Sequence, residues 1–434
     1  MKESLYNTIL NLDNGYRIIF NALSLKYLVA ADKLLPDFQG NLSAVKDAHL
    51  AEQLQEIGAV VNDDTDEVSI LRNLIREYDD NKESFHLHVN PTLDCNFRCH
   101  YCYEQHMAGS RMAPEIIDST ILLIRNIIAN SPELKYFYLS FFGGEPLMSF
   151  SNVVKPLILA LEKEAEARDV TSVLHFTSNG YLLNGQMFEF FNAHKASFQI
   201  TLDGHRDFHN QVRTASSGDS YDRILSNIGR LASIKCNVLV RINYTEQNML
   251  SIPAIIDDFR NLTDEQKQYI TFDLQRVWQD CSDERKEEIT SAITSYAEVI
   301  REAGYGASIH YVQDMVRNSC YGDKRNYALI NYDGYVFRCT ARDFIEKNRA
   351  GRLTADGRIE WYGNSLEKRL AAKFSRPVCH TCRIAPICGG GCCQAAVERP
   401  QSDSCMYGYT EEDMDKFVTD RFEYLCRINE TRVK

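Results

Sequence analysis

Six extended apolar runs alternate with amphipathic helical patterns between residue 85 and about residue 300, and this alternation constrains the fold most. The clearest helical pattern covers residues 113–130, where Ile and Leu recur at helical spacing after Pro114. Strands that alternate with helices form a parallel sheet with the helices packed on it. We therefore expect an α/β fold, a partial barrel of six βα units. Its predicted strands are Phe85–Asn90, Lys135–Phe141, Ser172–Thr177, Ser197–Asp203, Asn237–Asn243 and Tyr269–Gln275.

A cysteine-rich loop follows the first predicted strand, where the carboxyl ends of barrel strands carry the chemistry of such folds. Cys95, Cys99 and Cys102 stand at CxxxCxxC spacing. Thiolates are soft ligands that suit iron–sulfur clusters and zinc. One loop with three cysteines can hold a four-iron cluster and leave one iron free for a substrate or cofactor. The alternative is a structural zinc site in which His100 or His106 is the fourth ligand.

A second set of cysteines lies near the C-terminus. Thirteen residues separate Cys320 from Gly334, and four residues separate Gly334 from Cys339. Asp333-Gly334 predicts a tight hairpin turn between Tyr327–Tyr332 and Tyr335–Arg338. The set continues with Cys379, Cys382, Cys388, Cys392 and Cys405. With Cys393, which follows Cys392 directly, eleven of the 14 cysteines of the chain fall in spaced clusters, which indicates metal binding rather than disulfides.

Residues 1–84 precede the barrel and predict a small α+β domain. Tyr6–Leu10 and Tyr16–Phe20 read as a hairpin, and a helix follows around Ala44–Ile57. Two further short strands, Gly58–Val61 and Asp66–Ile70, would form a β-wing, and a helix is expected near Ile70–Tyr78. This arrangement resembles the winged domains that bind leader peptides on some peptide-modifying enzymes. A plain structural cap is the alternative.

Charge and hydropathy narrow the classes of function. The net charge of −12 over 434 residues disfavours nucleic-acid binding, which needs a basic surface. The N-terminal sequence has no signal-peptide pattern, and no apolar run reaches the roughly 18 residues of a membrane span. We therefore expect a cytoplasmic protein without membrane or nucleic-acid partners.

The cysteine loop resembles the signature of the radical S-adenosylmethionine (SAM) enzymes, in which an aromatic residue, here Tyr101, precedes the last cysteine. The resemblance implies a TIM-like partial barrel. It also implies a 4Fe-4S cluster whose open iron chelates the methionine moiety of SAM, and a 5′-deoxyadenosyl radical that abstracts hydrogen. The segment Gly143-Gly144-Glu145-Pro146 resembles the motif whose backbone faces the methionine amino group. By the same resemblance Ser178 would contact the ribose and Arg213 the carboxylate, and the remaining cofactor-binding candidates are Asn179 and Asp203. Ordinary turn chemistry is the alternative for these last two.

The C-terminal cysteines resemble the seven-cysteine pattern of the SPASM domain, which usually carries two auxiliary 4Fe-4S clusters. The family's ligation implies a first auxiliary cluster on Cys320, Cys339 and Cys392, and a second on Cys379, Cys382, Cys388 and Cys405. No further cysteine lies between Cys320 and Cys339. Either Cys281, Cys393 or Cys426 fills the fourth position of the first cluster, or one iron stays open. A double zinc module is the alternative.

Three domains follow from these patterns: a peptide-recognition domain over 1–84, a radical SAM partial barrel over 85–303 and a SPASM domain over 304–434. The resemblance implies a maturase that installs a crosslink or an oxidation in a ribosomal precursor peptide, with a flavodoxin- or ferredoxin-type electron donor. Sulfatase maturases carry an aspartate beside the cysteine that matches Cys339, whereas this chain has Thr340, with Asp343 three residues further on. This difference disfavours formylglycine formation, which stays an alternative, as does a non-enzymatic iron–sulfur or zinc protein. No general base is assigned, because a base is defined by its reach to the proton.

Overall fold

The computed structural model describes residues 1–12, 15–35, 41–215, 218–277, 285–309, 314–399 and 403–432. The chain divides into two compact units. The barrel unit comprises residues 82–310 and 326–363, and the terminal unit comprises residues 1–81, 311–325 and 364–434.

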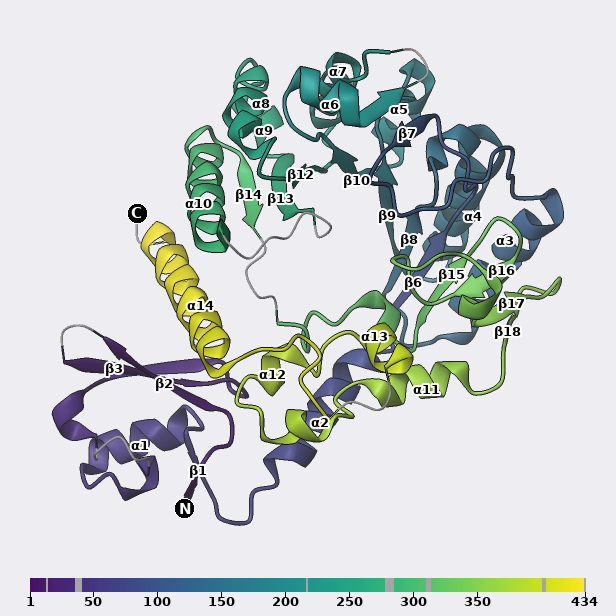
Figure 1. The fold of residues 1–434 in the computed structure, drawn as a ribbon. Helices are drawn as coiled ribbons and strands as arrows, with labels where there is room; N and C mark the ends of the chain where they lie inside the picture. Colours follow the sequence, from purple (N-terminus) through teal and green to yellow (C-terminus); the bar gives the residue numbers. More distant parts are fainter. Residues whose placement is uncertain are drawn as a thin grey trace. The chain divides into compact units, whose positions relative to one another are not determined.

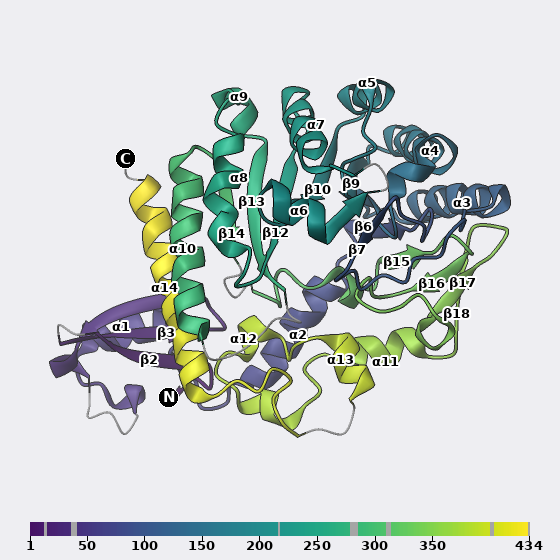
Figure 2. The ribbon, with the colours of Figure 1, turned by 45° about the horizontal axis from the view of Figure 1, so that its top comes forward.

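The barrel unit is built on an 11-stranded sheet with the order β14-β13-β12-β10-β9-β8-β6-β15-β16-β17-β18. All pairs from β14 to β15 are parallel, and the last three pairs are antiparallel. Figures 1 and 2 show the parallel strands curving as a partial barrel with the helices on their outer side. The predicted α/β partial-barrel fold is therefore confirmed.

The barrel unit consists of the strands of this sheet and the helices that connect them. The strands are β6 (Ser84–Val89), β8 (Tyr136–Phe141), β9 (Thr171–Ser178), β10 (Ala196–Thr201), β12 (Val238–Tyr244), β13 (Ile270–Arg276), β14 (Gly306–Ile309), β15 (Tyr327–Ile330), β16 (Tyr335–Phe337), β17 (Gly351–Leu353) and β18 (Ile359–Trp361). The helices are α3 (Pro114–Asn130), α4 (Lys155–Glu166), α5 (Gly185–Ala193), α6 (Arg206–Val212), α7 (Tyr221–Ser233), α8 (Ile252–Asp258), α9 (Asp264–Lys267) and α10 (Lys286–Glu302).

Side chains alternate between the two faces of the parallel sheet, as strand geometry requires. Phe141, Phe176 and Phe198 stack across β8, β9 and β10 with centroids 4.9 and 5.0 Å apart, and all three are fully buried in the main core. Polar and aromatic residues alternate with the core residues along the same strands: His86 of β6 stacks on Tyr138 of β8 at 4.3 Å. The sheet therefore has one apolar face and one face with polar and aromatic side chains.

Two strands extend the six predicted units. β14 follows α10 and joins the sheet beside β13, while β15 pairs in parallel with β6 at the other edge. β15 and β16 form the hairpin predicted from Asp333-Gly334, and Gly334 has the expected positive φ of 78°. This hairpin, which lies between Cys320 and Cys339 in the sequence, thus belongs to the barrel sheet. The charged run Asp283–Ala303 has the sequence pattern of a long helix and contains α10 (Lys286–Glu302), although its first residues lie outside the described residues.

The terminal unit contains a three-stranded sheet of β2 (Asn7–Leu12), β3 (Tyr16–Asn21) and β4 (Lys26–Ala31), and β1 (Lys2–Glu3) pairs with β5 (Val60–Val61). The predicted hairpin is confirmed. The helices of the terminal unit are α1 (Ala48–Glu56), α2 (Glu67–Asp79), α11 (Ser365–Ala372), α12 (Ala385–Cys388), α13 (Cys393–Glu398) and α14 (Glu411–Arg432). The prediction of a second wing strand over Asp66–Ile70 is wrong: these residues begin α2, because the Asp66 side chain caps the helix by accepting a hydrogen bond from the Ser69 N–H at 3.0 Å.

One apolar core joins the two ends of the chain within the terminal unit. Phe20 of β3 and Leu71 of α2 pack in the same buried cluster as Ile387 of α12 and Val418 of α14. Polar contacts accompany this core, since Lys373 lies 3.0 Å from both carboxylate oxygens of Asp79 and all these groups are buried. Residues 1–81 and the cysteine-rich segment therefore fold together.

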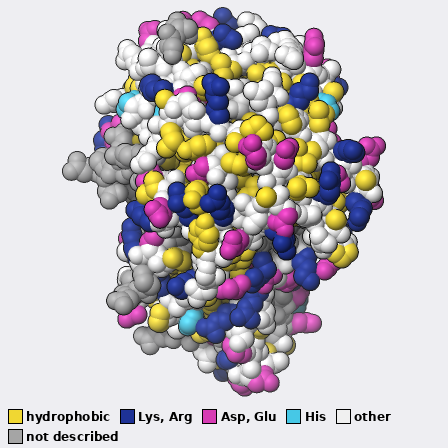
Figure 3. Space-filling model, turned by 90° about the vertical axis from the view of Figure 1, so that its right-hand side faces the viewer, with side chains coloured by type: hydrophobic (Ala, Val, Ile, Leu, Met, Phe, Trp, Pro, Cys, Tyr) yellow, Lys and Arg dark blue, Asp and Glu magenta, His cyan; other side chains and the backbone are white. Residues whose placement is uncertain are grey.

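Among the described residues, no helix combines the length and the apolar character that crossing a bilayer requires. On the face drawn in Figure 3, basic and acidic side chains are interspersed.

Candidate active site

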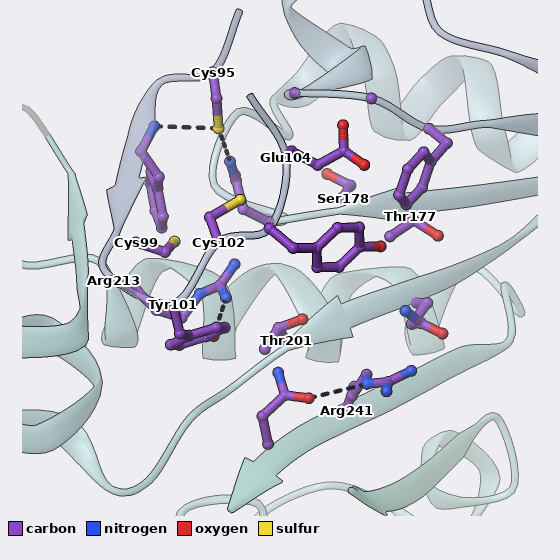
Figure 4. Close-up of a pocket in the computed structure, with 18 of the residues that line it drawn as sticks. Cys95, Cys99, Tyr101, Cys102, Glu104, Thr177, Ser178, Thr201, Arg213 and Arg241 are labelled. Atoms are coloured by element: carbon purple, nitrogen blue, oxygen red, sulfur yellow. Dashed lines mark hydrogen bonds between the residues drawn. The ribbon is translucent and has the colours of Figure 1, made fainter. Parts of the chain in front are cut away.

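The candidate site is a cavity of about 240 Å³ at the carboxyl ends of β8, β9, β10 and β12. Most of the predicted site residues of the barrel unit line it: Cys95, Cys99, Tyr101, Cys102, Gly143, Gly144, Ser178, Asn179 and Arg213. Figure 4 shows the three cysteines on one side of this pocket and polar side chains of the strands on the other. The two remaining predictions, Glu145 and Asp203, are buried behind the lining.

A short antiparallel pair holds the cysteine loop. β7 (Phe97–Cys99) pairs with β11 (Arg213–Ala215), and Arg213 is the register partner of Cys99. The loop and the segment after α6 are thus fixed to each other through backbone hydrogen bonds. This pairing brings the Arg213 side chain to the cysteines, although the two segments are more than 100 residues apart in the sequence.

Gly143 and Gly144 allow the loop after β8 to pack on the backbone of the cysteine loop. A Cβ atom on Gly144 would lie 2.1 Å from the carbonyl oxygen of Asp94, a contact that no folded protein tolerates. Hydrogen bonds from Gly144 N to Thr92 O (3.1 Å) and from Glu145 N to Asp94 O (2.9 Å) hold the two loops together. The glycines are therefore needed for the approach of two loops as well as for a backbone that faces the cavity.

Glu145 organises the residues after β9 from behind the cavity. Its fully buried carboxylate accepts hydrogen bonds from Ser178 Oγ (2.8 Å), Asn179 N (2.8 Å) and Leu147 N (3.0 Å). The hydroxyl of Ser178 donates to Glu145 and accepts from Gly180 N at 3.0 Å. One lone pair of this hydroxyl remains to accept from a ligand hydroxyl. Glu145 is thus a positioning residue.

Asp203 has the same kind of role on the other side of the cavity. Its buried carboxylate accepts from Arg213 Nη1 at 3.3 Å, from Asn243 N at 2.9 Å and from the hydroxyl of Tyr101. Arg213 Nη1 also donates to the Tyr101 hydroxyl at 2.6 Å. Tyr101 on the cysteine loop, Asp203 after β10 and Arg213 on β11 are therefore linked in one buried network.

The sequence analysis missed several residues that line the cavity. Glu104 follows the cysteine loop, and burial, with a smaller contribution from Asp343, raises its pKa to about 8. Thr201 and Arg241 reach the cavity from β10 and β12, and Arg241 Nε donates to Asn243 Oδ1 at 3.1 Å. Side chains alternate between the two faces of the sheet, and Thr201 and Arg241 fall on the face with the polar side chains. This alternation could have indicated both residues. Only the position of Glu104 in the cysteine stretch pointed to it.

The cysteines and their surroundings fit the expected cluster and SAM. Burial raises the pKa of Cys95 to about 12, and metal binding would stabilise the thiolate form of this side chain. Arg213 lines the cavity with a buried Nε that has no hydrogen-bond partner in the described part of the chain, as a carboxylate-binding group would.

The zinc alternative requires several ligands on one ion. Cys102 Sγ lies 3.5 Å from His106 Nε2, but no group of three or more His, Cys, Asp or Glu side chains in the described ranges could hold a single metal ion. A four-iron cluster does not need such convergence, because each cysteine binds a different iron.

A second cavity, of about 150 Å³, lies in the terminal unit. The four cysteines predicted for the second auxiliary cluster line it together: Cys379, Cys382, Cys388 and Cys405. Apolar and aromatic side chains form most of the remaining lining, together with Thr381 and Glu411, and Met414 Sδ of α14 lies 3.8 Å from Cys382 Sγ. Four thiols around a small, mostly apolar cavity are a donor set that fits a 4Fe-4S cluster.

The three cysteines predicted for the first auxiliary cluster belong to both units. Cys320 and Cys392 are in the terminal unit and Cys339 is in the barrel unit, so their joint ligation stays a prediction. Of the candidates for the fourth position, Cys393 is buried and interacts with Asp323, Cys426 is exposed on α14, and Cys281 lies outside the described residues.

Residues 89–259 match the model of the radical SAM superfamily. This match agrees with the partial-barrel fold and with the cysteine loop at the carboxyl ends of its strands. Two curated relatives are enzymes. The chain is 23% identical to GTP 3′,8-cyclase of Microcystis aeruginosa over 56% of its length and 78% of that protein. It is 26% identical to the serine-type anaerobic sulfatase-maturating enzyme of Bacteroides thetaiotaomicron over 34% of its length and 37% of that protein.

Two solved structures share the fold. Native anSMEcpe with bound AdoMet and Cp18Cys peptide superimposes with a TM-score of 0.59 at 16% identity, over 81% of this chain and 100% of that one. Streptococcus suis SuiB bound to precursor peptide SuiA gives a TM-score of 0.55 at 14% identity, over 94% of this chain and 99% of that one. The likeness to SuiB extends over nearly the whole chain, including the terminal unit.

Proposed function

We propose that this chain is a radical SAM maturase that modifies a residue of a ribosomally made peptide. The observation that carries the proposal is the cavity in which three cysteines of one loop lie beside Arg213 and the glycine pair at the carboxyl ends of parallel strands. A loaded cluster would supply the electron that breaks the C5′–S bond of bound SAM, which would give methionine and a 5′-deoxyadenosyl radical able to abstract hydrogen from the peptide.

The residues of this chain would bind and orient SAM. Arg213 would bind its carboxylate through the free Nε, while Asp203 fixes the guanidinium from behind. Ser178, held by Glu145, would accept a hydrogen bond from the ribose. Tyr101 would tie the cysteine loop to this network.

Three observations support a peptide substrate. The two similar structures were solved with bound peptides, one of them a precursor peptide. The likeness to SuiB covers 94% of the chain. A four-cysteine cavity accompanies the radical SAM domain in the same chain, as expected for a SPASM domain. Residues 1–81 would contribute to leader binding, although they share their core with the cysteine-rich segment.

Formylglycine formation in a sulfatase is the second candidate, because 34% of the chain is 26% identical to a sulfatase-maturating enzyme. Thr340 stands where those enzymes carry an aspartate, and Asp343 lies close enough to Glu104 to influence its pKa. This difference favours another reaction on a peptide.

The experiment is anaerobic reconstitution followed by reduction with dithionite in the presence of SAM. We expect 5′-deoxyadenosine from the wild type and none from the variant with Cys95, Cys99 and Cys102 changed to Ala. Peptides encoded beside the gene are then added, and a mass change in one of them identifies the substrate. A wild type that forms no 5′-deoxyadenosine would overturn the proposal, and a mass change only in a sulfatase-derived peptide would favour the second candidate.

A further inference from the structure

Arg241 is a cation of the cavity lining that forms no ion pair within the part of the chain that the structure describes. The other two arginines of the lining have carboxylate partners. Arg213 lies 3.3 Å from Asp203, and Arg276 lies 4.0 Å from Glu246. Because an arginine stays ionised at every working pH, the charge of Arg241 remains in the cavity. The cavity therefore offers a position for a negatively charged ligand group.

The guanidinium of Arg241 is held by one edge. Its Nε donates to Asn243 Oδ1 at 3.1 Å. Asn243 is fixed in turn, since its N–H donates to Asp203 Oδ1 at 2.9 Å and its carbonyl accepts from Asn248 Nδ2 at 3.0 Å. Nη1 and Nη2 of Arg241 have no hydrogen-bond partner among the described residues. These two groups form the planar fork that binds a carboxylate with two parallel hydrogen bonds.

The neighbours of Arg241 in the lining are uncharged. Thr201 of β10 is its register partner on one side, and Gln199 lies two residues earlier on the same strand. Asp273 of β13 is the register partner on the other side and lies outside the lining. Its Oδ1 accepts from Gln275 Nε2 at 2.8 Å, and between these described residues there is no ion pair with Arg241. Hydroxyl and amide groups thus flank the fork without neutralising it.

Two ligand carboxylates come into question, that of SAM and one of the peptide. Arg213 suits the first, because it is the register partner of Cys99 and the amino-acid part of SAM is expected at the cluster. Figure 4 draws Arg241 on the side of the strands, away from Cys95. We infer that Arg241 binds a carboxylate of the peptide substrate and selects peptides with an acidic side chain, or a free C-terminus, near the modified residue. This inference rests on the proposed peptide maturation and names a substrate class for it.

The experiment measures the binding of synthetic hexapeptides to the reconstituted, unreduced, SAM-loaded protein by equilibrium dialysis with detection by mass spectrometry. Three mixtures share randomised uncharged positions. One has Asp at a fixed position with both ends capped, one has Asn there with both ends capped, and one has Asn there with a free C-terminal carboxylate. We expect the wild type to bind one or both of the carboxylate mixtures about tenfold more tightly than the capped Asn mixture. The mixture that binds more tightly shows whether the carboxylate belongs to a side chain or to the C-terminus.

The variants locate this preference in the cavity. Arg241→Gln should abolish it and leave the dissociation constant of SAM within about twofold of the wild-type value. Arg276→Gln is the matched control, because Arg276 lines the same cavity but lies beside Glu246, and it should keep the preference. Arg241→Lys keeps the charge without the fork and should show an intermediate preference.

Equal binding of the three mixtures by the wild type would overturn the inference. So would a preference that persists in Arg241→Gln, or one that is lost in both Gln variants. A SAM dissociation constant raised about tenfold in Arg241→Gln would assign Arg241 to the carboxylate of SAM instead. The proposed function is tested separately, because 5′-deoxyadenosine formation and the mass change of a peptide are measured on the reduced protein and do not enter the dialysis.

Discussion

Arg213 Nη1 and Asp203 Oδ2 form an ion pair of 3.3 Å that is almost completely shielded from solvent, and Tyr101 of the cysteine loop bonds to both. The pair connects the strand that holds the cysteine loop to the end of β10. Because it lies behind the cavity lining, Asp203 orients Arg213 rather than contacting the cofactor.

Replacing Asp203 with Asn should therefore destabilise the barrel unit. The change leaves the buried guanidinium without its counter-charge, which typically costs about 3–5 kcal/mol. This corresponds to a fall in the melting temperature of about 10 °C, measured by thermal unfolding with circular dichroism. Asp222→Asn is the matched control, because its ion pair with Arg206 is exposed and contributes at most about 1 kcal/mol. Equal melting temperatures for the two variants would contradict the proposed role.

The Gly144→Ala variant should fail to hold the cluster of the barrel unit. The added Cβ would overlap the Asp94 carbonyl oxygen, so the cysteine loop and the loop after β8 must separate. We expect the loss of about four irons per chain, measured by iron analysis after reconstitution. Gly185→Ala, at the start of α5 with open space around its Cβ position, should keep the iron content of the wild type. A Gly144→Ala protein with full iron content would refute this packing argument.

Two neighbouring cysteines of the terminal unit should behave differently. Cys388 lines the four-cysteine cavity, so Cys388→Ala should lower the iron content by about four per chain. Cys393 is buried beside Asp323 and lies outside the lining of that cavity, so Cys393→Ala should keep the iron content and lower only the melting temperature. Iron loss in Cys393→Ala would instead make Cys393 a ligand.

The stability of the barrel unit should decrease as the pH falls below 6.5. Burial, with smaller contributions from His175 and His86, lowers the pKa of His88 to about 3, and burial beside Arg213 lowers that of His209 similarly. The unfolded chain thus binds more protons than the folded one between about pH 6.5 and pH 3, and stability rises with pH in this window. Each histidine contributes about 1.4 kcal/mol per pH unit there. His88→Gln should show a smaller decrease of the melting temperature between pH 6.5 and pH 5, and an unchanged pH dependence would contradict this assignment.

The sequence was sufficient to predict the elements whose signals are local. The six strands and the helix from Pro114 carry strong periodic patterns, and Asp333-Gly334 defines its own turn. The second wing strand was mispredicted because Val68 and Ile70 alternate with polar residues as in a strand. The capping of α2 by Asp66 decided otherwise.

The features that depend on distant contacts were not predictable in this way. The pairing of β15 with β6 joins residues about 240 positions apart, and the core that unites Phe20 with Val418 spans most of the chain. The sequence analysis named Glu145 and Asp203, but only the structure shows that they orient Ser178 and Arg213 from behind the cavity. Glu104 was missed because its place beside the cysteine loop was the only local sign of its position in the cavity, and its burial is visible only in the structure.

Iron and acid-labile sulfide content of the anaerobically reconstituted protein tests the central claim most directly. The account predicts about twelve irons and twelve sulfides per chain, and about eight of each when Cys95, Cys99 and Cys102 are changed to Ala. Stoichiometric zinc with little iron in the wild type would contradict it and leave a structural metal-binding protein.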